Sequence, residues 1–326
     1  IMKICIFGGG SIGGLLAVHL TKIGINISVI ARGQHLDVMR KNGITLINPQ
    51  GQEERAAVTC TDDPNSLGLQ DYLFLTIKSP ALLPSLEKIK PLVGENTTII
   101  TCMNGIPHWY FHKLSNQYKN YKIKCLDPYL LIDSIIPPNK IVGSVVYPAC
   151  EIVEPGKIKH INGNRFSLGE PDGRETDRLK FISEILKKAG FRAPIQKNIR
   201  DEIWLKLIGN LSFNPISALT GATLEQICND IGTEAIVREM MTEAKLIAEK
   251  LGAKINMSIE KRIDGARKVG AHKTSMLQDI EAGKPIEINS IIVAVKELGE
   301  LTNSPTPYIN TILNLTLQKA KLIGCL

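Results

Sequence analysis

Residues 3–14 read KICIFGGGSIGG, an apolar run of β-forming residues that ends in a cluster of glycines. Residues 15–24 continue with helical spacing up to Gly24, and residues 27–30 form a second apolar strand. A strand, a glycine turn, a helix and a strand within about 30 residues are the context in which a G-x-G-x-x-G motif indicates dinucleotide binding. The stretch therefore predicts an N-terminal βαβ unit of the Rossmann type.

The glycines of this motif have separate roles. Gly8 allows the tight turn, Gly10 lets the backbone approach a pyrophosphate, and Gly13 lets the helix pack on the strand. The N-terminus of the helix then offers N–H groups and a partial positive charge to the phosphates. The alternative is a structural turn without a ligand. We expect the pyrophosphate to be bound by Gly8, Gly9, Gly10, Ser11, Ile12 and Gly13.

The end of the second strand indicates which dinucleotide is bound. NAD-binding units usually carry Asp or Glu there, which accepts a hydrogen bond from the ribose 2′-hydroxyl, whereas this sequence has Ile30-Ala31-Arg32. A carboxylate would repel a 2′-phosphate, and a guanidinium can bind it with paired hydrogen bonds. Arg32 therefore predicts NADPH or NADP+, and the alternative is an ordinary surface arginine.

Strands and helices continue to alternate after the first unit. Strands are predicted at residues 71–77 and 97–102, and helices at 82–92 and 176–189. Residues 122–169 are rich in β-forming and turn residues, and we expect them to add antiparallel strands to the sheet. This alternation predicts a doubly wound sheet.

Two polar residues follow predicted strands of this sheet. Lys78 comes after the strand that ends at Ile77, and Asn104 after the strand that ends at Cys102. Ligands in doubly wound sheets bind beyond the carboxyl ends of the strands, so we expect both residues near the cofactor. Polar residues are common in loops, so each is weak evidence alone.

The strand signals fade after residue 197, and the remaining chain consists of helical segments. The sequence therefore predicts a dinucleotide-binding domain at residues 1–197 and a helical substrate domain at residues 198–326. The expected fold class is α/β, with a Rossmann-type doubly wound sheet followed by an all-α C-terminal domain.

The first helix of the second half is apolar all round except for one stripe. Lys206, Asn210 and Asn214 span only about 80° of its circumference, and Ser217 falls in the same arc. Buried polar groups are costly without partners, so the stripe predicts a polar cleft. The alternative is a lysine that extends to solvent beside two asparagines at a helix contact.

Two further polar residues begin predicted helices. Ser275 opens Ser-Met-Leu-Gln, which has the pattern of a capping box with Gln278. Glu287 precedes an apolar helix, where a carboxylate is favourable to the helix dipole. Capping explains both residues as well as a functional role does.

The composition is that of an ordinary globular protein. A net charge of +7 with scattered lysines argues against a nucleic-acid binder. The seven cysteines form no C-x-x-C pair, which suits a reducing cytoplasm. His108 and His112 could share a helix face, but no third ligand is evident, and we expect no metal. No apolar stretch approaches the roughly 20 residues that cross a bilayer, so we expect no membrane partner.

Together these segments resemble the ketopantoate reductases (2-dehydropantoate 2-reductases). The likeness covers nearly the whole chain in the same order, and Trp-x-Lys and Ser-Met-Leu-Gln-Asp are its more specific motifs. It is carried by residues 8–13, Thr76-Ile-Lys78, Asn104-Gly105, residues 198–206, Asn210, Asn214-Pro215, residues 275–279 and Glu287.

The resemblance implies a role for each of these positions. Lys206 matches the catalytic lysine, which hydrogen-bonds the keto oxygen and donates its proton. Glu287 matches a catalytic glutamate near the nicotinamide ribose and the substrate. Asn104 matches the asparagine beside nicotinamide and substrate. Lys78 and, less securely aligned, Ala149 match cofactor contacts, and the matched substrate-binding residues are Asn210, Asn214 and Ser275.

The implied reaction is NADPH-dependent reduction of 2-dehydropantoate to pantoate, a step of pantothenate and coenzyme A biosynthesis. His272 stands where some members have asparagine, and Leu224 falls where another substrate-side asparagine can occur. Lys284, Pro285 and Asn289 replace frequent arginine, threonine and aspartate. A reductase of another branched 2-oxo acid and a non-catalytic NADPH-binding regulator therefore stay open. The sequence is compatible with a homodimer but does not define the oligomeric state.

Overall fold

The computed structural model describes residues 2–326, which form two compact units. Unit 1 contains the chain up to Met103 and Leu130–Ile199. Unit 2 contains Asn104–Tyr129 and Arg200–Leu326. The boundary at Ile199 lies beside the predicted boundary after residue 197. The sequence prediction, however, assigns residues 104–129 to the first domain. Aromatic residues explain the difference, because Tyr110 of this segment bonds Trp204 of the helix that opens the second segment of unit 2.

Unit 1 is built on a seven-stranded sheet with the order β11-β8-β7-β6-β1-β2-β5. All neighbours are parallel except β11, which runs antiparallel to β8. Apart from the edge strand β5 and the first residues of β7, the strands are buried along most of their length, as parallel strands covered by helices should be. They are β1 (Ile4–Phe7), β2 (Ile27–Ile30), β5 (Thr59–Thr61), β6 (Gln70–Leu75), β7 (Val93–Thr101), β8 (Ile141–Val146) and β11 (Phe166–Gly169).

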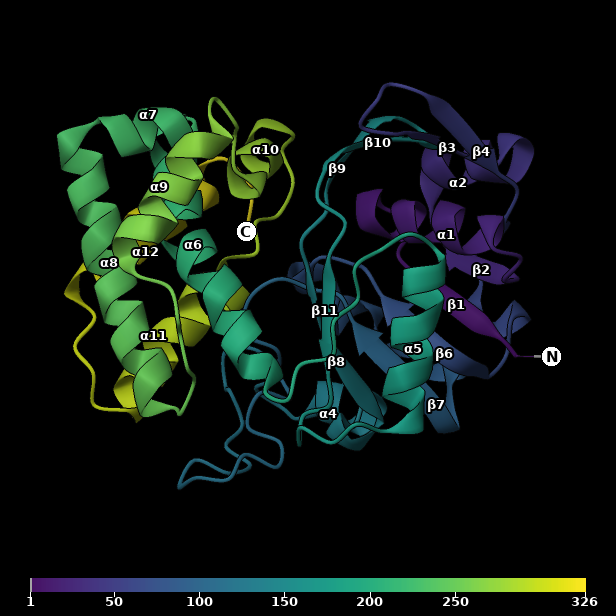
Figure 1. The fold of residues 1–326 in the computed structure, drawn as a ribbon, viewed down its shortest axis with the longest axis horizontal. Coiled ribbons are helices and arrows are strands. Elements are labelled where there is room, and N and C mark those ends of the chain that lie inside the picture. Colours follow the sequence, from purple (N-terminus) through teal and green to yellow (C-terminus); the bar gives the residue numbers. More distant parts are fainter. Residues whose placement is uncertain (1) are drawn as a thin grey trace. The chain divides into compact units, whose positions relative to one another are not determined.

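A second sheet of four strands lies in the same unit, with the order β4-β3-β10-β9. Its strands are β3 (Ile44–Ile47), β4 (Glu53–Ala56), β9 (Ala149–Glu154) and β10 (Lys157–Asn162), which Figure 1 shows together beside α1. The expectation that residues 122–169 only extend the main sheet with antiparallel strands was therefore wrong. Only β11 does so, since β8 is parallel to β7 and β9 and β10 pair with β3. The β3–β4 hairpin was not predicted.

Helices α1 (Ser11–Lys22) and α5 (Asp177–Lys188) contribute to one apolar core with the main sheet. Helix α1 also contacts the second sheet, and a Cβ at Gly14 would lie only 1.9 Å from Ile158 of β10. The side chain of Ile158 would therefore have to move to admit a larger residue at position 14. Further helices of unit 1 are α2 (Gly33–Asn42), α3 (Leu86–Ile89) and α4 (Leu131–Ile135).

The helix predicted at residues 82–92 is wrong in its form. The chain makes 3₁₀ turns at Ser79–Ala81, Leu83–Ser85 and Lys90–Leu92, and only α3 between them is α-helical. Pro84 and Pro91 explain this, since proline lacks the N–H that a continuous α-helix needs.

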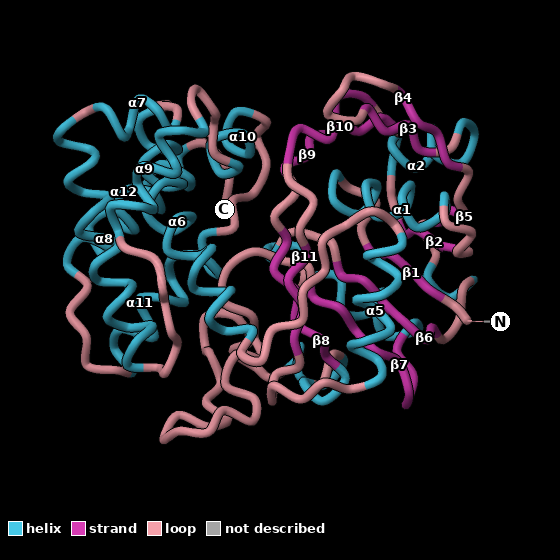
Figure 2. The backbone as a smooth tube through the Cα atoms, viewed as in Figure 1, coloured by secondary structure: helices cyan, strands magenta, loops and turns pink. Residues whose placement is uncertain are grey.

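Unit 2 is helical, and Figure 2 shows no strand in its described residues. Its α-helices are α6 (Ile199–Thr220, shared with the boundary), α7 (Leu224–Asn229), α8 (Ile231–Lys250), α9 (Ile259–Val269), α10 (Ser275–Glu281), α11 (Ala294–Leu301) and α12 (Pro307–Leu322). A π-helical segment, η6 (Asn289–Val293), precedes α11. The predicted fold class, a parallel-sheet domain with a helical second part, is confirmed, whereas α7 was not predicted.

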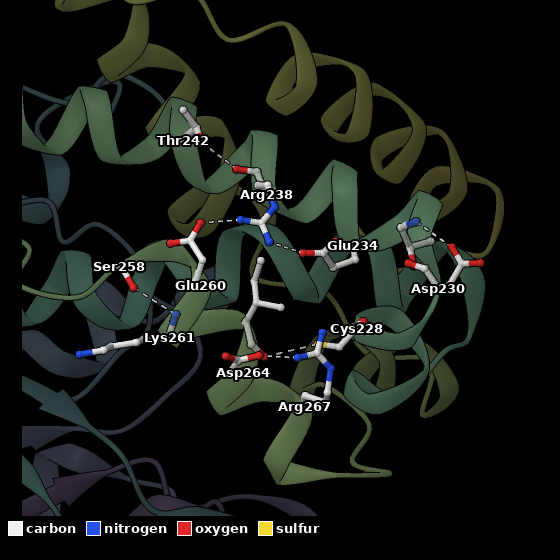
Figure 3. A network of polar contacts seen from close by, with 12 residues as sticks. Cys228, Asp230, Glu234, Arg238, Thr242, Ser258, Glu260, Lys261, Asp264 and Arg267 are labelled. Atoms are coloured by element: carbon white, nitrogen blue, oxygen red, sulfur yellow. Dashed lines mark hydrogen bonds and ion pairs between the residues drawn. The ribbon is translucent and has the colours of Figure 1, made fainter.

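Ion pairs connect α8 with α9 (Figure 3). Arg238 of α8 bonds Glu234 one turn earlier and Glu260 of α9, at 2.6 and 2.7 Å. Arg267 of α9 reaches the carbonyl oxygen of Cys228 on α7 at 3.1 Å. These contacts are partly exposed, so each contributes at most about 1 kcal/mol, and the apolar core holds the helices together.

Candidate functional site

The glycine turn of unit 1 is tight on one side and open on the other. Gly8 has φ +118°, and a Cβ there would lie 2.8 Å from the side chain of Ile77. A Cβ at Gly13 would lie 1.9 Å from the Gly8 carbonyl oxygen, so glycine is needed where α1 approaches the turn. A Cβ at Gly10 would meet no atom within 4 Å. The open side at Gly10 leaves room for a ligand to approach the backbone.

Hydrogen bonds hold the turn against the neighbouring strands. The N–H groups of Gly8 and Gly9 donate to the Ile30 carbonyl oxygen at 3.1 and 2.9 Å. Thr76, just beyond β6, donates from Oγ1 to the Gly8 carbonyl oxygen at 2.7 Å. Helix α1 begins without a side-chain cap at its N-cap, Gly10. Uncapped N–H groups beside an open turn fit the pyrophosphate of a dinucleotide.

The other predicted cofactor residues of unit 1 lie at the ends of elements. Arg32 is exposed and is the N-cap of α2, immediately beyond β2. Lys78 is exposed and precedes a 3₁₀ turn beyond β6. Ala149 is half-buried and begins β9. Arg32 and Lys78 thus lie just past the carboxyl ends of β2 and β6, the two parallel strands on either side of β1, where such sheets bind ligands.

Three predicted residues of unit 2 meet through one side-chain amide. Lys206 of α6 donates from Nζ to Oδ1 of Asn104 at 2.7 Å. Asn104 donates from Nδ2 to Oε2 of Glu287 at 3.1 Å. An ammonium can only donate and a carboxylate can only accept, so the two charges fix the orientation of the amide between them. Glu287 is 4% exposed, whereas Asn104 and Lys206 are half-buried, so the network is most strongly desolvated at its carboxylate.

A close backbone contact brings Asn104 to Glu287. Gly105 has φ +86°, and a Cβ there would lie 2.4 Å from the Ser290 carbonyl oxygen. The Ile106 N–H donates to the same oxygen at 2.8 Å. Ser290 lies in η6, three residues after Glu287, and π-helical segments often occur at functional sites. Glycine at position 105 therefore sets the distance between Asn104 and the glutamate.

The segment after Asn104 is fixed to the start of α6. Arg200 is buried and donates from Nε to the Tyr110 carbonyl oxygen at 2.7 Å and from Nη2 to the His112 carbonyl oxygen at 2.8 Å. Trp204 donates from Nε1 to the Tyr110 hydroxyl at 2.7 Å. Burial raises the pKa of Tyr110 to about 12, so this hydroxyl stays neutral. Arg200 and Trp204 thereby hold Asn104 beside Lys206.

The polar stripe of α6 divides into ligand candidates and a structural residue. Asn210 is half-buried, and Asn214 is 5% exposed. The Nδ2 of Asn214 has no hydrogen-bond partner among residues 2–326. Ser217 is satisfied, since its Oγ donates to the Ala222 carbonyl oxygen at 2.7 Å and closes the end of the helix. A buried amide without a partner is costly, so Asn214 fits a ligand contact.

Ser275 does not cap α10, so the capping-box interpretation was wrong. Thr274 is the N-cap and accepts from the Leu277 N–H at 3.3 Å. The Gln278 amide bonds the Lys273 carbonyl oxygen instead. Ser275 is exposed at the first position of the helix, and no described hydrogen bond joins it to Lys206, Asn104 or Glu287.

Residues 2–326 show the features of neither a metal centre nor a membrane-spanning protein. No group of His, Cys, Asp and Glu there could hold a metal ion. No helix in the described chain is long and apolar enough to cross a membrane. The seven cysteines are all described, and none forms a disulfide.

Known proteins resemble this chain over its whole length. Two family models match, "Ketopantoate reductase PanE/ApbA" at residues 4–173 and its C-terminal counterpart at residues 198–320. The 2-dehydropantoate 2-reductase of Mesorhizobium japonicum is 47% identical over 325 residues, which cover 99% of each chain.

Solved structures share the fold. A crystal structure assigned to the ketopantoate reductases, from Ralstonia solanacearum MolK2, superposes with a TM-score of 0.95 at 37% identity and covers 100% of this chain and 99% of its own. A D-mandelate dehydrogenase with NADH and anilino(oxo)acetate has a TM-score of 0.85 at 20% identity, covering 99% of this chain and 100% of its own. The second likeness shows the fold alone.

Proposed function

Since the chain belongs to the ketopantoate reductase family, we propose that it reduces 2-dehydropantoate to pantoate with NADPH. The reaction is a step of pantothenate and coenzyme A biosynthesis. The observation that carries the proposal is the Lys206–Asn104–Glu287 network, because it presents an oriented ammonium in a half-buried position. Cysteines without disulfides fit a reducing compartment, so we place the reaction in the cytoplasm.

Lys206 supplies the acid of the reaction. A bound NADPH would supply the hydride that reaches C2 of the keto acid. Negative charge develops on the carbonyl oxygen, and an ammonium directed at that oxygen stabilises the charge and then protonates it. Asn104 accepts from Lys206 and thereby holds the ammonium, while Glu287 orients the Asn104 amide. We therefore assign proton donation to Lys206 and orientation of the donor to the other two residues.

The stripe of α6 provides contacts for the substrate. Asn214 has an Nδ2 group that a substrate hydroxyl or carboxylate oxygen would satisfy. Asn210 lies one turn nearer to Lys206 on the same helix, and we add Ser275 from the family resemblance. Several contacts from one rigid helix fix the orientation of a small acid, which is where positioning accelerates a reaction.

The glycine turn and α1 fit the pyrophosphate, and Arg32 fits the 2′-phosphate that distinguishes NADPH from NADH. We place Lys78, Ala149, Asn104 and Glu287 beside the rest of the cofactor on the family resemblance. Lys78 follows β6, Ala149 begins β9, and Asn104 bonds both Lys206 and Glu287, which supports this assignment.

A second candidate is reduction of another branched 2-oxo acid. The two substrate-side departures from the family pattern are neighbours, because the Leu224 N–H donates to the His272 carbonyl oxygen at 3.0 Å. If both residues line the substrate pocket, that part of the pocket has fewer side-chain amides than in family members with asparagine at the positions of Leu224 and His272. This observation favours testing acids of different branching and polarity.

Oxidation of NADPH, followed by the loss of nicotinamide absorbance, tests both candidates. We expect the highest kcat/KM for 2-dehydropantoate within a panel of linear and branched 2-oxo acids. Lys206→Ala should lower kcat by at least about 10²–10³-fold, because it removes the group that stabilises the developing charge. Lys296→Ala is the matched control, since the side chain of Lys296 is 41% exposed and forms an ion pair with Glu300 one turn away at 3.2 Å.

The outcomes separate the hypotheses. A higher kcat/KM for another acid would replace the substrate and keep the mechanism. A near-normal kcat for Lys206→Ala would remove this lysine from the reaction. Tight binding of NADPH without turnover of any acid in the panel would instead support a non-catalytic regulator.

A further inference from the structure

The ring of His35 joins the glycine turn to the turn between β9 and β10. Its Nε2 lies 2.6 Å from the Gly9 carbonyl oxygen, and its Nδ1 lies 2.8 Å from the Gly156 N–H. All three residues belong to unit 1, and the side chain of His35 is half-buried. The residue lies on α2, three positions after Arg32.

The two contacts determine which nitrogen carries the proton. A backbone N–H only donates, so Nδ1 must present its lone pair to Gly156. The neutral ring then carries its hydrogen on Nε2, which donates to the Gly9 carbonyl oxygen. His35 therefore acts as an Nε2–H tautomer with one acceptor and one donor in use.

The bond to Gly9 sets the direction of the next N–H. A trans peptide is planar, so the Gly9 C=O and the Gly10 N–H point in opposite directions. His35 thus turns the Gly10 N–H away from α2. The N–H groups of Gly8 and Gly9 already donate to Ile30, and the open space of the turn is at Gly10. The next N–H along the chain is therefore the first that a ligand can use.

The other side of the ring is held firmly. Gly156 has φ +73°, and a Cβ there would lie 2.6 Å from Cγ1 of Val38 on α2. Its carbonyl oxygen accepts from the Thr45 N–H of β3 at 2.9 Å. The turn that bonds Nδ1 is therefore packed on the helix that carries His35 and tied to the second sheet. This leaves the imidazole little freedom to rotate away from Gly9.

We propose that His35 is a positioning residue for the dinucleotide, which holds the Gly9–Gly10 peptide so that the Gly10 N–H and the N-terminus of α1 face the pyrophosphate. The inference rests on the proposed function, since it assigns the turn to NADPH. It also means that one helix, α2, contributes to binding both phosphate groups. Its N-cap Arg32 contacts the 2′-phosphate, and its His35 orients the turn that binds the pyrophosphate.

Three variants test the role. His35→Phe keeps a ring of similar size and loses both hydrogen bonds. His35→Gln restores one donor and one acceptor. His19→Gln is the matched control, because His19 also bonds a backbone carbonyl of unit 1, that of Ala189 at 2.9 Å, away from the glycine turn. For each protein we would measure the NADPH Kd by fluorescence titration, KM for NADPH, kcat at saturating NADPH, and the Tm without cofactor.

We expect His35→Phe to raise the Kd and KM for NADPH roughly tenfold, the effect of about one lost hydrogen bond. The kcat at saturating NADPH should stay within about twofold, because binding energy rather than the chemical step is affected. His35→Gln should recover most of the affinity, and His19→Gln should bind NADPH normally. Nitrogen NMR of the wild type should show an unprotonated Nδ1 at neutral pH.

A structural role alone gives a different result. In that case His35→Phe lowers the Tm but binds NADPH normally below the transition, which overturns the inference. A protonated Nδ1, or failure of His35→Gln to recover any affinity, also overturns it. A wild type that binds no NADPH would contradict the proposed function itself. Normal binding by both wild type and His35→Phe would contradict only the role of His35.

Discussion

At the scale of single residues, the proposed preference for NADPH over NADH rests on Arg32. Its guanidinium is exposed at the N-cap of α2, and the helix begins without a side-chain cap. A 2′-phosphate placed there would meet both a fixed positive charge and free helix N–H groups. NADH has only a hydroxyl at this position, so it gains neither contact.

Arg32→Ala should therefore raise the KM for NADPH by about 10–100-fold, as expected for a lost charge-assisted hydrogen bond. The KM for NADH should change little. Arg40→Ala is the control on the same helix, because Arg40 is exposed and bonds Asp62 at 3.0 Å. Steady-state kinetics with both nucleotides make the comparison, and equal effects of Arg32→Ala on NADPH and NADH would contradict the assignment.

Some residues of the candidate site could be predicted from local spacing alone, whereas the contacts of others could not. Periodicity alone placed Lys206, Asn210 and Asn214 on one face of a helix, since that needs only local spacing. Asn104 and Glu287 stood out by their places after a strand and before a helix, but only the family resemblance put both near the nicotinamide and the substrate. Their contact spans 183 positions in the sequence. No local pattern carries such a contact.

His35 and Thr76 were missed as parts of the glycine turn for the same reason. His35 contacts Gly9 and Gly156, the latter 121 positions away, and Thr76 contacts Gly8 across 68 positions. The sequence signal available was weak: a polar residue one turn into α2, and a threonine directly after a strand. Their contacts with the glycine turn depend on how distant strands pair in the folded protein, which the local sequence does not show.

At the scale of elements, α12 depends on a cap from another helix. Its N-cap, Thr306, makes no side-chain cap bond, and Pro307 follows. Glu243 of α8 accepts instead from the Tyr308 and Ile309 N–H groups, both at 2.9 Å. Burial raises the pKa of Glu243, and the two N–H bonds offset only part of that effect.

Glu243→Ala should lower the free energy of unfolding by about 1–3 kcal/mol, since it leaves buried helix N–H groups without an acceptor. The raised pKa means that the folded state binds the proton more tightly than the unfolded chain. The contribution of Glu243 to the free energy of unfolding therefore grows as the pH falls from above its raised pKa in the folded state toward its ordinary value in the unfolded chain. The loss of stability in Glu243→Ala grows over the same pH range.

Urea unfolding at two pH values measures both effects. Glu249→Ala is the control, because Glu249 is exposed on the same helix and does not contribute to the raised pKa of Glu243. We expect it to change the unfolding free energy by less than about 0.5 kcal/mol. Equal stabilities of the two variants would show that α12 does not need this cap.

Elements were predicted well where one local signal dominates and poorly where distant partners decide. The βαβ start, α5 and the long helices of unit 2 follow from apolar spacing. The second sheet did not, because β3 and β10 are parallel neighbours separated by more than a hundred residues. The helix predicted at residues 82–92 was wrong because that prediction did not take account of the prolines within the segment, which interrupt an α-helix.

At the scale of the whole molecule, the chain passes between its two units more than once. Residues 104–129 leave unit 1 after β7 and belong to unit 2, and the chain then returns at Leu130. Trp109, Tyr110 and Phe111 of this segment are at most 2% exposed. Arg200 and Trp204 of α6 supply part of their surroundings. A cut after residue 197 therefore removes partners of an aromatic cluster that stays behind.

A fragment of residues 1–197 should consequently aggregate or unfold without a cooperative transition, because it exposes these aromatic side chains. The same fragment with residues 104–129 replaced by a flexible Gly/Ser linker should stay monomeric and unfold cooperatively, since unit 1 keeps its sheets and core. Size-exclusion chromatography and thermal unfolding compare the two. NADPH titration of the linker fragment adds a functional measure, because the glycine turn, Arg32 and His35 all lie in unit 1. Cooperative unfolding of the uncut 1–197 fragment, with the linker fragment no more stable, would show that residues 104–129 fold with the first half of the chain instead.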